Sequence, residues 1–376
     1  MAVARIRRRA AFALFALLLA ACSQTPAVRG DLSPQFGETT AGADAAQQLA
    51  AGPEGVFVGG VWNGRSALIK FSRAGRIPWV RTLPRAAVAR AVAAAPGGAA
   101  YALYTLADAG GTVGLYARGY SREGVVAWTR RVTTADGGAP LDAFAATDGG
   151  GNLYVAASLG YLETGRGELR KYRPDGAPLW LKPTAYVYDL GVSRNGFAHT
   201  VTWDGGTQAL TRYKPDGKLL WRVPVPYGYE RQAVAVGGES EIYVASHEER
   251  FPAQWFTTLT RYNSRGERVW GREVASGVGQ LLDGLEADAA GTALLALTRP
   301  NADPEFSYRP KSLYAYSASG RRLSYRVFDF GAERPLVGPA ALRADETYVA
   351  LAGDGGGLGG PLVRLDALTG VVAWTR

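Results

Sequence analysis

The sequence has few of the residues that build disulfides and metal sites. It contains one cysteine, one methionine and two histidines in 376 residues. One cysteine cannot form a disulfide within the chain, and two histidines do not supply the ligand set of a structural zinc site. Disulfide scaffolds and zinc fingers are therefore excluded, and we expect no metal and no cofactor.

Charged residues are also scarce, at 20%, whereas hydrophobic residues make up 47%. This balance supports a large core and excludes an intrinsically disordered chain. The length alone suggests two or three domains, but all-β architectures of this size often form one. Beyond the N-terminal region no run of eighteen apolar residues occurs, so the sequence predicts no membrane-spanning helix.

The N-terminus combines basic residues with a short apolar run. Four arginines precede twelve apolar residues, Ala10 to Ala21. Such a run is too short to span a bilayer as a helix, and the combination is typical of a secretory signal peptide. It ends in Leu19-Ala20-Ala21-Cys22, which resembles the lipobox of bacterial lipoproteins. The resemblance implies that residues 1–21 are a signal peptide and that Cys22 is acylated and begins the mature chain.

An ordinary signal peptide with a chance cysteine is the alternative. If Cys22 is acylated, each buried CH₂ contributes about 0.8 kcal/mol, so two or three acyl chains anchor stably. Ser23, rather than Asp, resembles the sorting pattern for the outer membrane, so we expect the cell envelope, and its outer rather than its inner membrane. Residues 22–43 are small and polar and predict a tether with a span of roughly 25 Å.

One pattern recurs seven times in the rest of the chain. Its clearest copies are Lys171–Trp180, Arg212–Trp221 and Arg261–Trp270. In every copy a glycine lies four residues before the tryptophan position, and successive glycines are 41 to 54 residues apart. This period is typical of solenoids or propeller blades, not of independent domains. The glycines are Gly75, Gly124, Gly176, Gly217, Gly266, Gly320 and Gly370.

Each copy predicts a β-hairpin, because a turn such as Pro-Asp-Gly separates two short alternating segments. A second pair of segments lies upstream, for example Leu141–Thr147 and Asn152–Ala157. Each repeat therefore supplies four strands, A to D, and residues 44–376 are expected to form an all-β, seven-bladed β-propeller of four-stranded antiparallel blades. Strand B carries a large residue in six copies, Phe57, Tyr101, Tyr154, Tyr243, Leu294 and Tyr348, with Ala198 as the expected exception.

These repeats resemble known families. The third to fifth copies resemble the seven-bladed propeller repeats of bacterial secreted proteins and lipoproteins. The last copy, Leu365–Trp374, resembles the quinoprotein-type repeat, which also builds the propeller lipoprotein of the outer-membrane β-barrel assembly machine. The resemblance implies the fold for nearly the whole mature chain and leaves the function open, since propellers host many functions.

The tryptophan at a fixed place in each repeat is expected to be core, because a blade must bury its face against its neighbour. A ligand cage or quinone-stacking site is the alternative that we set aside. For ring closure, we expect residues 34–37 to extend or flank the strand that ends at Arg376.

Chemical motifs are sparse. The pattern G-x-G-x-x-G occurs at Gly355–Gly360, but a strand rather than a helix is predicted after it, so it is expected to be a B–C loop and not a phosphate-binding loop. His199 and His247 lie on strands at different registers, which favours packing over catalysis. We name no catalytic residue.

Carboxylates on the predicted innermost strands could face a central channel. A convergent ring of such groups would bind cations or activate water. Their registers differ, and arginines Arg90, Arg231 and Arg334 lie on similar segments, so solvated groups with local ion pairs are the favoured interpretation. The carboxylates are Asp142, Asp189, Asp283 and Glu286.

Loop length gives the best functional indication. The B–C connections of blades five and six are expected to be long, over residues 248–254 and 299–311, and to open on the same face as the D–A loops. Aromatic residues with arginine are typical of binding hot spots, although rings that cap blade ends are the alternative. The candidate partner-binding residues are Tyr227, Tyr229, Arg250, Phe251, Trp255, Phe306, Tyr308 and Arg309.

The formal net charge of +9 falls to +5 once the four arginines of the leader are removed. The remaining basic residues recur beside the tryptophans, as in Trp79-Val80-Arg81, so they spread around the ring and predict no nucleic-acid partner.

We expect a monomeric, lipid-anchored, non-enzymatic propeller that binds a protein or polysaccharide in the envelope through the B–C/D–A loop face. The alternatives are a channel enzyme (hydrolase, lyase or quinoprotein-like) and a scaffold in outer-membrane protein assembly.

Overall fold

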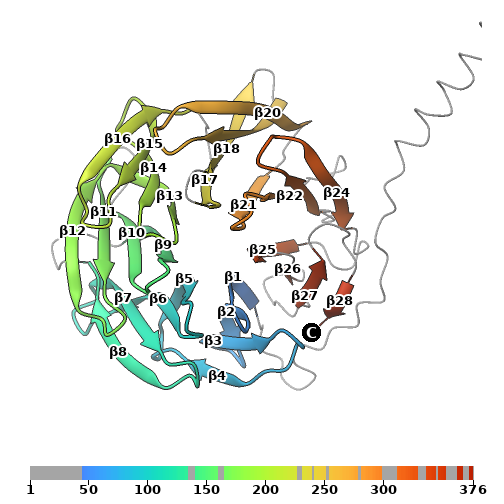
Figure 1. Cartoon of the computed structure of the whole chain (residues 1–376). Helices are drawn as coiled ribbons and strands as arrows, with labels where there is room; N and C mark the ends of the chain where they lie inside the picture. Colours follow the sequence, from blue (N-terminus) through green and yellow to red (C-terminus); the bar gives the residue numbers. More distant parts are fainter. Residues whose placement is uncertain are drawn as a thin grey trace, which may run out of the picture.

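The computed structural model describes residues 45–133, 140–159, 165–226, 231–238, 241–250, 254–277, 281–298, 311–328, 336–343, 346–352, 362–366 and 372–375. Within these ranges all the regular secondary structure is β-strand, so the described residues contain no helix that could cross a membrane. The strands group into seven four-stranded antiparallel sheets, arranged radially (Figure 1). The predicted all-β propeller of four-stranded antiparallel blades is confirmed.

Each blade is built from four consecutive strands, with strand A innermost and strand D outermost (Figure 1). We number the blades one to seven in chain order. The strands of blades one to four are β1 Ala45–Gly52, β2 Gly55–Trp62, β3 Arg65–Ser72, β4 Trp79–Thr82, β5 Val88–Ala94, β6 Ala100–Ala107, β7 Val113–Tyr120, β8 Val126–Arg131, β9 Pro140–Thr147, β10 Leu153–Leu159, β11 Gly167–Tyr172, β12 Pro178–Thr184, β13 Tyr186–Val192, β14 Ala198–Trp203, β15 Gln208–Tyr213 and β16 Leu219–Pro224.

The remaining blades repeat this order. Neighbouring blades contact each other through their innermost strands, and the strand that opens blade seven lies against the strand that opens blade one. The strands of blades five to seven are β17 Arg231–Val236, β18 Ile242–Arg250, β19 Gln254–Tyr262, β20 Arg268–Gly277, β21 Leu281–Ala287, β22 Ala293–Thr298, β23 Lys311–Tyr316, β24 Arg322–Phe328, β25 Leu336–Arg343, β26 Glu346–Ala352, β27 Leu362–Asp366 and β28 Val372–Thr375.

The tryptophan of each outer strand packs against the C–D turn of the next blade. In β8, the indole Nε1 of Trp128 donates a hydrogen bond of 2.8 Å to the carbonyl of Pro174, and the ring lies against Gly176 in the same turn. The expectation that the tryptophans are core is therefore confirmed where their side chains are described. The equivalent bonds are Trp79 to Arg122 (3.0 Å), Trp180 to Pro215 (2.9 Å), Trp221 to Ser264 (2.9 Å) and Trp270 to Ala318 (2.9 Å).

A basic residue of strand C reaches the same turn carbonyl. Lys70 of β3 donates to the Arg122 carbonyl at 3.2 Å, and Arg261 of β19 donates to the Ala318 carbonyl at 2.9 Å. Arg364 of β27 makes the same bond, at 2.9 Å, to the carbonyl of Arg73 in blade one. The last blade is thereby joined to the first by the contact that joins the others. Residues 34–37 and Arg376, which we expected at this closure, lie outside the described residues.

Strand B adds a third contact between blades. The Tyr154 hydroxyl donates to the Gly196 carbonyl at 2.8 Å, and Tyr101 and Tyr243 make equivalent bonds to the next blade. The strand pairing shows that Ala198, which we expected to replace the large strand-B residue in blade four, does not occupy that position. Tyr154 pairs with Lys171, whereas it is His199 that pairs with the equivalent Arg212. The histidine therefore occupies the tyrosine position in blade four.

The long B–C connection predicted for blade five is also wrong. Residues 248–250 extend β18 and Gln254 begins β19, with Arg250 paired to Gln254. Cross-strand pairing continues to the end of the hairpin because both segments keep an extended backbone, so only residues 251–253 connect them. In blade seven, β27 follows the Gly355–Gly360 motif, as predicted, although the motif itself lies outside the described residues.

The turn glycines provide a test of the contact between blades. A Cβ at Gly176 would lie 2.6 Å from the Trp128 ring, and the backbone φ of +80° at this position is strained for any residue that has a side chain. We expect Gly176→Ala to lower the free energy of unfolding by about 1–3 kcal/mol, measured by urea titration. Gly97→Ala is the control, because a Cβ there meets nothing within 4 Å. Equal stability of the two variants would contradict this packing role.

Candidate functional site

The innermost strands enclose a central cavity of about 930 Å³. Its described walls come from β1, β5, β9, β13, β17 and β21, and most of them are alanine, valine and leucine. All four carboxylates that the sequence placed on the innermost strands line this cavity, together with Arg90. These five charged side chains thus border the same cavity, and the register of each strand decides which of them lie close to one another.

β-Bulges re-aim the side chains of these strands. The register of cross-strand pairs skips one residue in each of β5, β13 and β21, namely Arg90, Tyr188 and Asp283. A bulge adds one residue to one strand, which bends it and turns the following side chains. The bulge on β13 therefore sets the direction of Asp189, which follows it.

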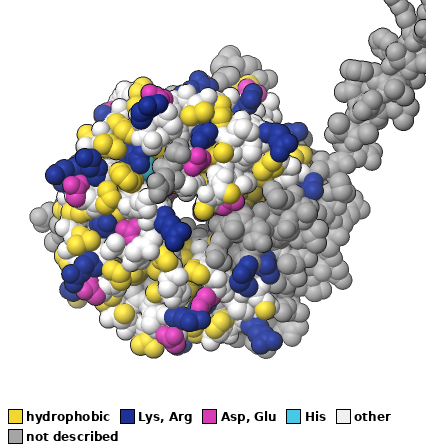
Figure 2. Space-filling view, in the orientation of Figure 1, with side chains coloured by type: hydrophobic (Ala, Val, Ile, Leu, Met, Phe, Trp, Pro, Cys, Tyr) yellow, Lys and Arg dark blue, Asp and Glu magenta, His cyan; other side chains and the backbone are white. Residues whose placement is uncertain are grey.

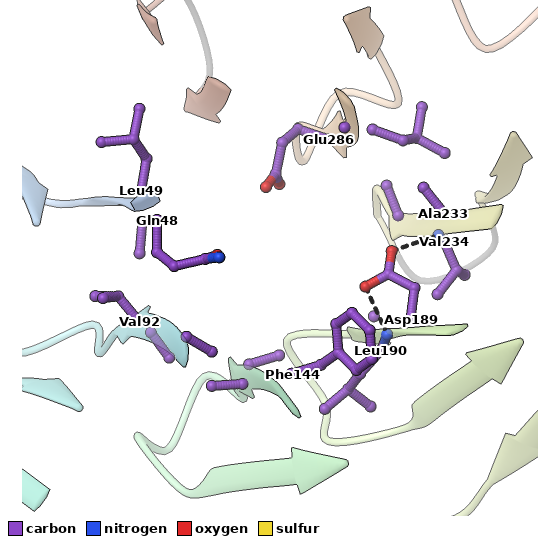
Figure 3. Close-up of a pocket in the computed structure, with 18 of the residues that line it drawn as sticks. Gln48, Leu49, Val92, Phe144, Asp189, Leu190, Ala233, Val234 and Glu286 are labelled. Carbon is purple, nitrogen blue, oxygen red and sulfur yellow. Dashed lines mark hydrogen bonds between the residues drawn. The ribbon is translucent and has the colours of Figure 1, made fainter. Parts of the chain in front are cut away.

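Asp189 is held by the backbone of two blades. Its carboxylate accepts hydrogen bonds from the Leu190 amide at 2.8 Å and from the Val234 amide of β17 at 2.7 Å (Figure 3). Burial raises the pKa of Asp189 to about 6, and the two amide bonds oppose that rise. The side chain is therefore rigidly placed at the channel wall.

Glu286 lies at a register position where the other blades have small residues. It pairs with Leu294, and the equivalent inner residues are alanine or glycine, as in Ala146 opposite Tyr154 and Gly191 opposite His199. Burial raises the pKa of Glu286 to about 8, and the like charge of Asp189 adds to the rise. Its carboxylate points into the cavity (Figure 3).

A second polar group lies toward the start of the inner strands. The Tyr186 hydroxyl donates a hydrogen bond of 2.5 Å to Asp142 of the preceding blade, and burial together with this carboxylate raises the pKa of the phenol. Arg90 donates to the Thr105 hydroxyl at 3.2 Å. Asp142 and Arg90 thus have hydrogen-bonding partners, although neither partner is the opposite charge that the sequence-based interpretation expected.

Neither histidine lines the channel cavity. His247 is buried with its Nδ1 3.0 Å from the Thr257 hydroxyl, and His199 is buried beside Trp221. Among the described residues no group of three or more His, Cys, Asp or Glu could hold a metal ion. The expected packing role of the histidines agrees with this placement.

Most of the candidate partner-binding residues lie outside the described part of the chain. The exceptions are Arg250 and Trp255, whose backbones belong to the B–C hairpin of blade five. Sequence reasoning overlooked Trp62 and Trp203, which end β2 and β14 at the same face. The sequence did contain a signal for them, because Trp62, Trp203 and Trp255 are the three tryptophans that fall outside the repeat. The residues outside the described part are Cys22, Tyr227, Tyr229, Phe251, Phe306, Tyr308 and Arg309.

The comparisons support the fold alone. Virginiamycin B lyase from Staphylococcus aureus superposes with a TM-score of 0.56 at 9% identity, covering 82% of this chain and 92% of that one. The WD40 domain of Toxoplasma gondii coronin gives 0.54 at 12% identity, covering 86% and 83%. A Lactobacillus plantarum protein gives 0.52 at 11% identity, covering 91% and 94%. No family model matches the chain, and no curated protein matches it.

The buried His199 predicts a pH-dependent stability. Burial and the nearby Arg212 lower its pKa to about 3 from an ordinary 6.5. Only the unfolded chain binds this proton between those values, so the free energy of unfolding should fall as the pH drops from 6.5 toward 3. We expect His199→Phe to lessen that fall, measured by urea titration at pH 7 and pH 4.

Tyr243→Phe is the matched control for this experiment. It changes the equivalent position in blade five and removes a 2.6 Å bond to the Gly291 carbonyl without removing a histidine. Its cost should be similar at both pH values. A His199→Phe variant with the same pH dependence as the original chain would show that the histidine is not responsible.

Proposed function

We propose that this chain is a lipid-anchored, seven-bladed envelope propeller that binds a protein or polysaccharide partner through its B–C/D–A loop face, without catalysing a reaction. The observation that carries the proposal is the position of the three tryptophans that fall outside the repeat. Trp62, Trp203 and Trp255 all lie at B–C hairpins, on blades one, four and five.

These positions suit a binding face. Trp62 pairs with Arg65 across a turn, and Trp203 pairs with Gln208. Both tryptophans are only half-buried, so part of each ring stays open to a partner. Tryptophan, tyrosine and arginine are enriched in binding hot spots because they offer a large apolar area with a polar group. Of the candidate residues from sequence, Arg250 and Trp255 belong to the B–C hairpin of blade five.

The anchor and compartment rest on the N-terminal sequence. Arginines, a short apolar run and Cys22 support export and acylation, and the tether would hold the propeller near the outer membrane. Basic and acidic side chains lie scattered over the visible face in Figure 2, and exposed pairs such as Arg173–Asp175 join opposite charges. Charge that is mixed in sign over this face does not favour a polyanion such as nucleic acid.

Channel chemistry is the second candidate. Asp189 and Glu286 line one cavity and have pKa values raised to about 6 and about 8, which suits proton transfer. A hydrolase, lyase or quinoprotein-like activity would use that site. A scaffold in outer-membrane protein assembly is a variant of the first proposal, with the partner drawn from that machinery.

The binding face is tested by crosslinking in cells. We expect Trp203→Ala with Trp255→Ala to reduce partner capture at least tenfold, because truncated hot-spot rings cost more than 1 kcal/mol each. Captured partners are identified from the acylated chain after crosslinking. The control is Arg265→Ala in a C–D turn on the opposite face, where the side chain is 77% exposed. Undiminished capture by a folded double variant would contradict this face.

The anchor is tested separately. Cys22→Ser removes the acylated thiol, so we expect the protein to move from the membrane fraction to the soluble envelope fraction. Immunoblots of separated fractions check this, with inner and outer membranes resolved on a density gradient. A variant that stays with the membrane would show that another interaction holds the propeller there.

A further inference from the structure

Three polar side chains from three blades converge in the central channel. Gln48 of β1, Asp189 of β13 and Glu286 of β21 all line the cavity, and Figure 3 shows their polar ends directed toward its middle. Gln48 and Asp189 are 141 residues apart in sequence and Asp189 and Glu286 are 97 apart, so only the closed ring brings them together.

Glu286 is the residue that does not fit the repeat. At its register position the other six blades have Ala50, Ala93, Ala146, Gly191, Ala235 and Ala341.

A methyl group or hydrogen satisfies packing there, whereas a half-buried carboxylate loses part of its hydration and gains nothing in return without a partner. Among the described residues Glu286 has no hydrogen bond or ion pair, and its one electrostatic neighbour is the like-charged Asp189. Packing therefore does not account for this side chain.

The other charged groups of the channel have partners of their own. Asp142 accepts the Tyr186 hydroxyl, and Arg90 donates to Thr105. Asp189 uses its carboxylate for two backbone amides, which leaves further lone pairs directed into the cavity. The pair of carboxylates thus forms a negative region, and Arg90, which lines the same cavity, is not among the groups that shift the pKa of either carboxyl.

We propose that the channel binds the primary ammonium group of a small organic molecule, which donates its three N–H bonds to Asp189, Glu286 and the side-chain carbonyl of Gln48. An ammonium group has three donors and no acceptor, which matches three acceptors from three directions. A cavity of about 930 Å³ is large enough for a small ligand.

The walls specify the rest of the ligand. Leu49, Val92 and Ala233 border the cavity beside the polar group with most of their surface buried in the cores of the blades, so the walls offer a short alkyl chain a limited apolar contact. The ligand class is therefore a short alkylammonium ion. This site is independent of the partner-binding face, since it uses inner strands rather than loops.

The probe is 1,4-diaminobutane, titrated into the full mature chain by calorimetry at pH 9 and low salt. At this pH both carboxyls are ionised, since their pKa values lie at about 6 and about 8, while the amines keep their protons. We expect one saturable site per chain. Glu286→Ala should weaken binding at least tenfold and still fold, because alanine is the residue of most other blades at this position.

Two controls separate this site from general attraction to a negative channel. Asp142→Asn removes a channel carboxylate that Tyr186 already engages, and it should leave the affinity within twofold. The hexamethylated bis-quaternary analogue of the probe keeps both charges but has no N–H, and it should not compete. Absence of binding, equal binding by Glu286→Ala, an equal loss in Asp142→Asn, or effective competition by the analogue would each overturn the proposal.

Discussion

The structure depends on the contact between the tryptophan of one blade and the C–D turn of the next. The indole N–H donates to the second residue of the turn, and the ring covers a glycine whose φ only glycine adopts without strain. A single such hydrogen bond contributes about 1 kcal/mol, but each also positions a large ring, buried in Trp79 and Trp128 and half-buried in blades three to five. Repetition of this contact, with the Arg364–Arg73 bond at the seam, holds the ring by its outer half.

Because the outer contacts hold the ring, the inner strands can vary. Their positions need only small residues for packing, and most have alanine. A charged side chain can therefore enter the channel without weakening the contacts between blades, which explains how Glu286 is tolerated. The bulges on β5, β13 and β21 add a second source of variation, since each changes where the following side chains point.

The repeats in the sequence were sufficient to predict the architecture, since a glycine and a tryptophan four residues apart recur at blade length. Single positions were harder to place. Ala198 and His199 are adjacent, and only the pairing of His199 with Arg212 shows which one faces the next blade. The hairpin of blade five was mistaken for a loop because polar residues such as Glu248 and Glu249 weaken the alternation, while backbone pairing continues through them.

The sequence by itself determined the blade pattern and the positions of the packing tryptophans, because each of these is a local pattern of residue types. The tertiary structure decided which distant residues meet. Gln48, Asp189 and Glu286 carry no shared motif, and their meeting results from ring closure, bulge position and strand register. Ring closure, bulge position and strand register depend on the backbone geometry of the whole chain, which no short segment encodes.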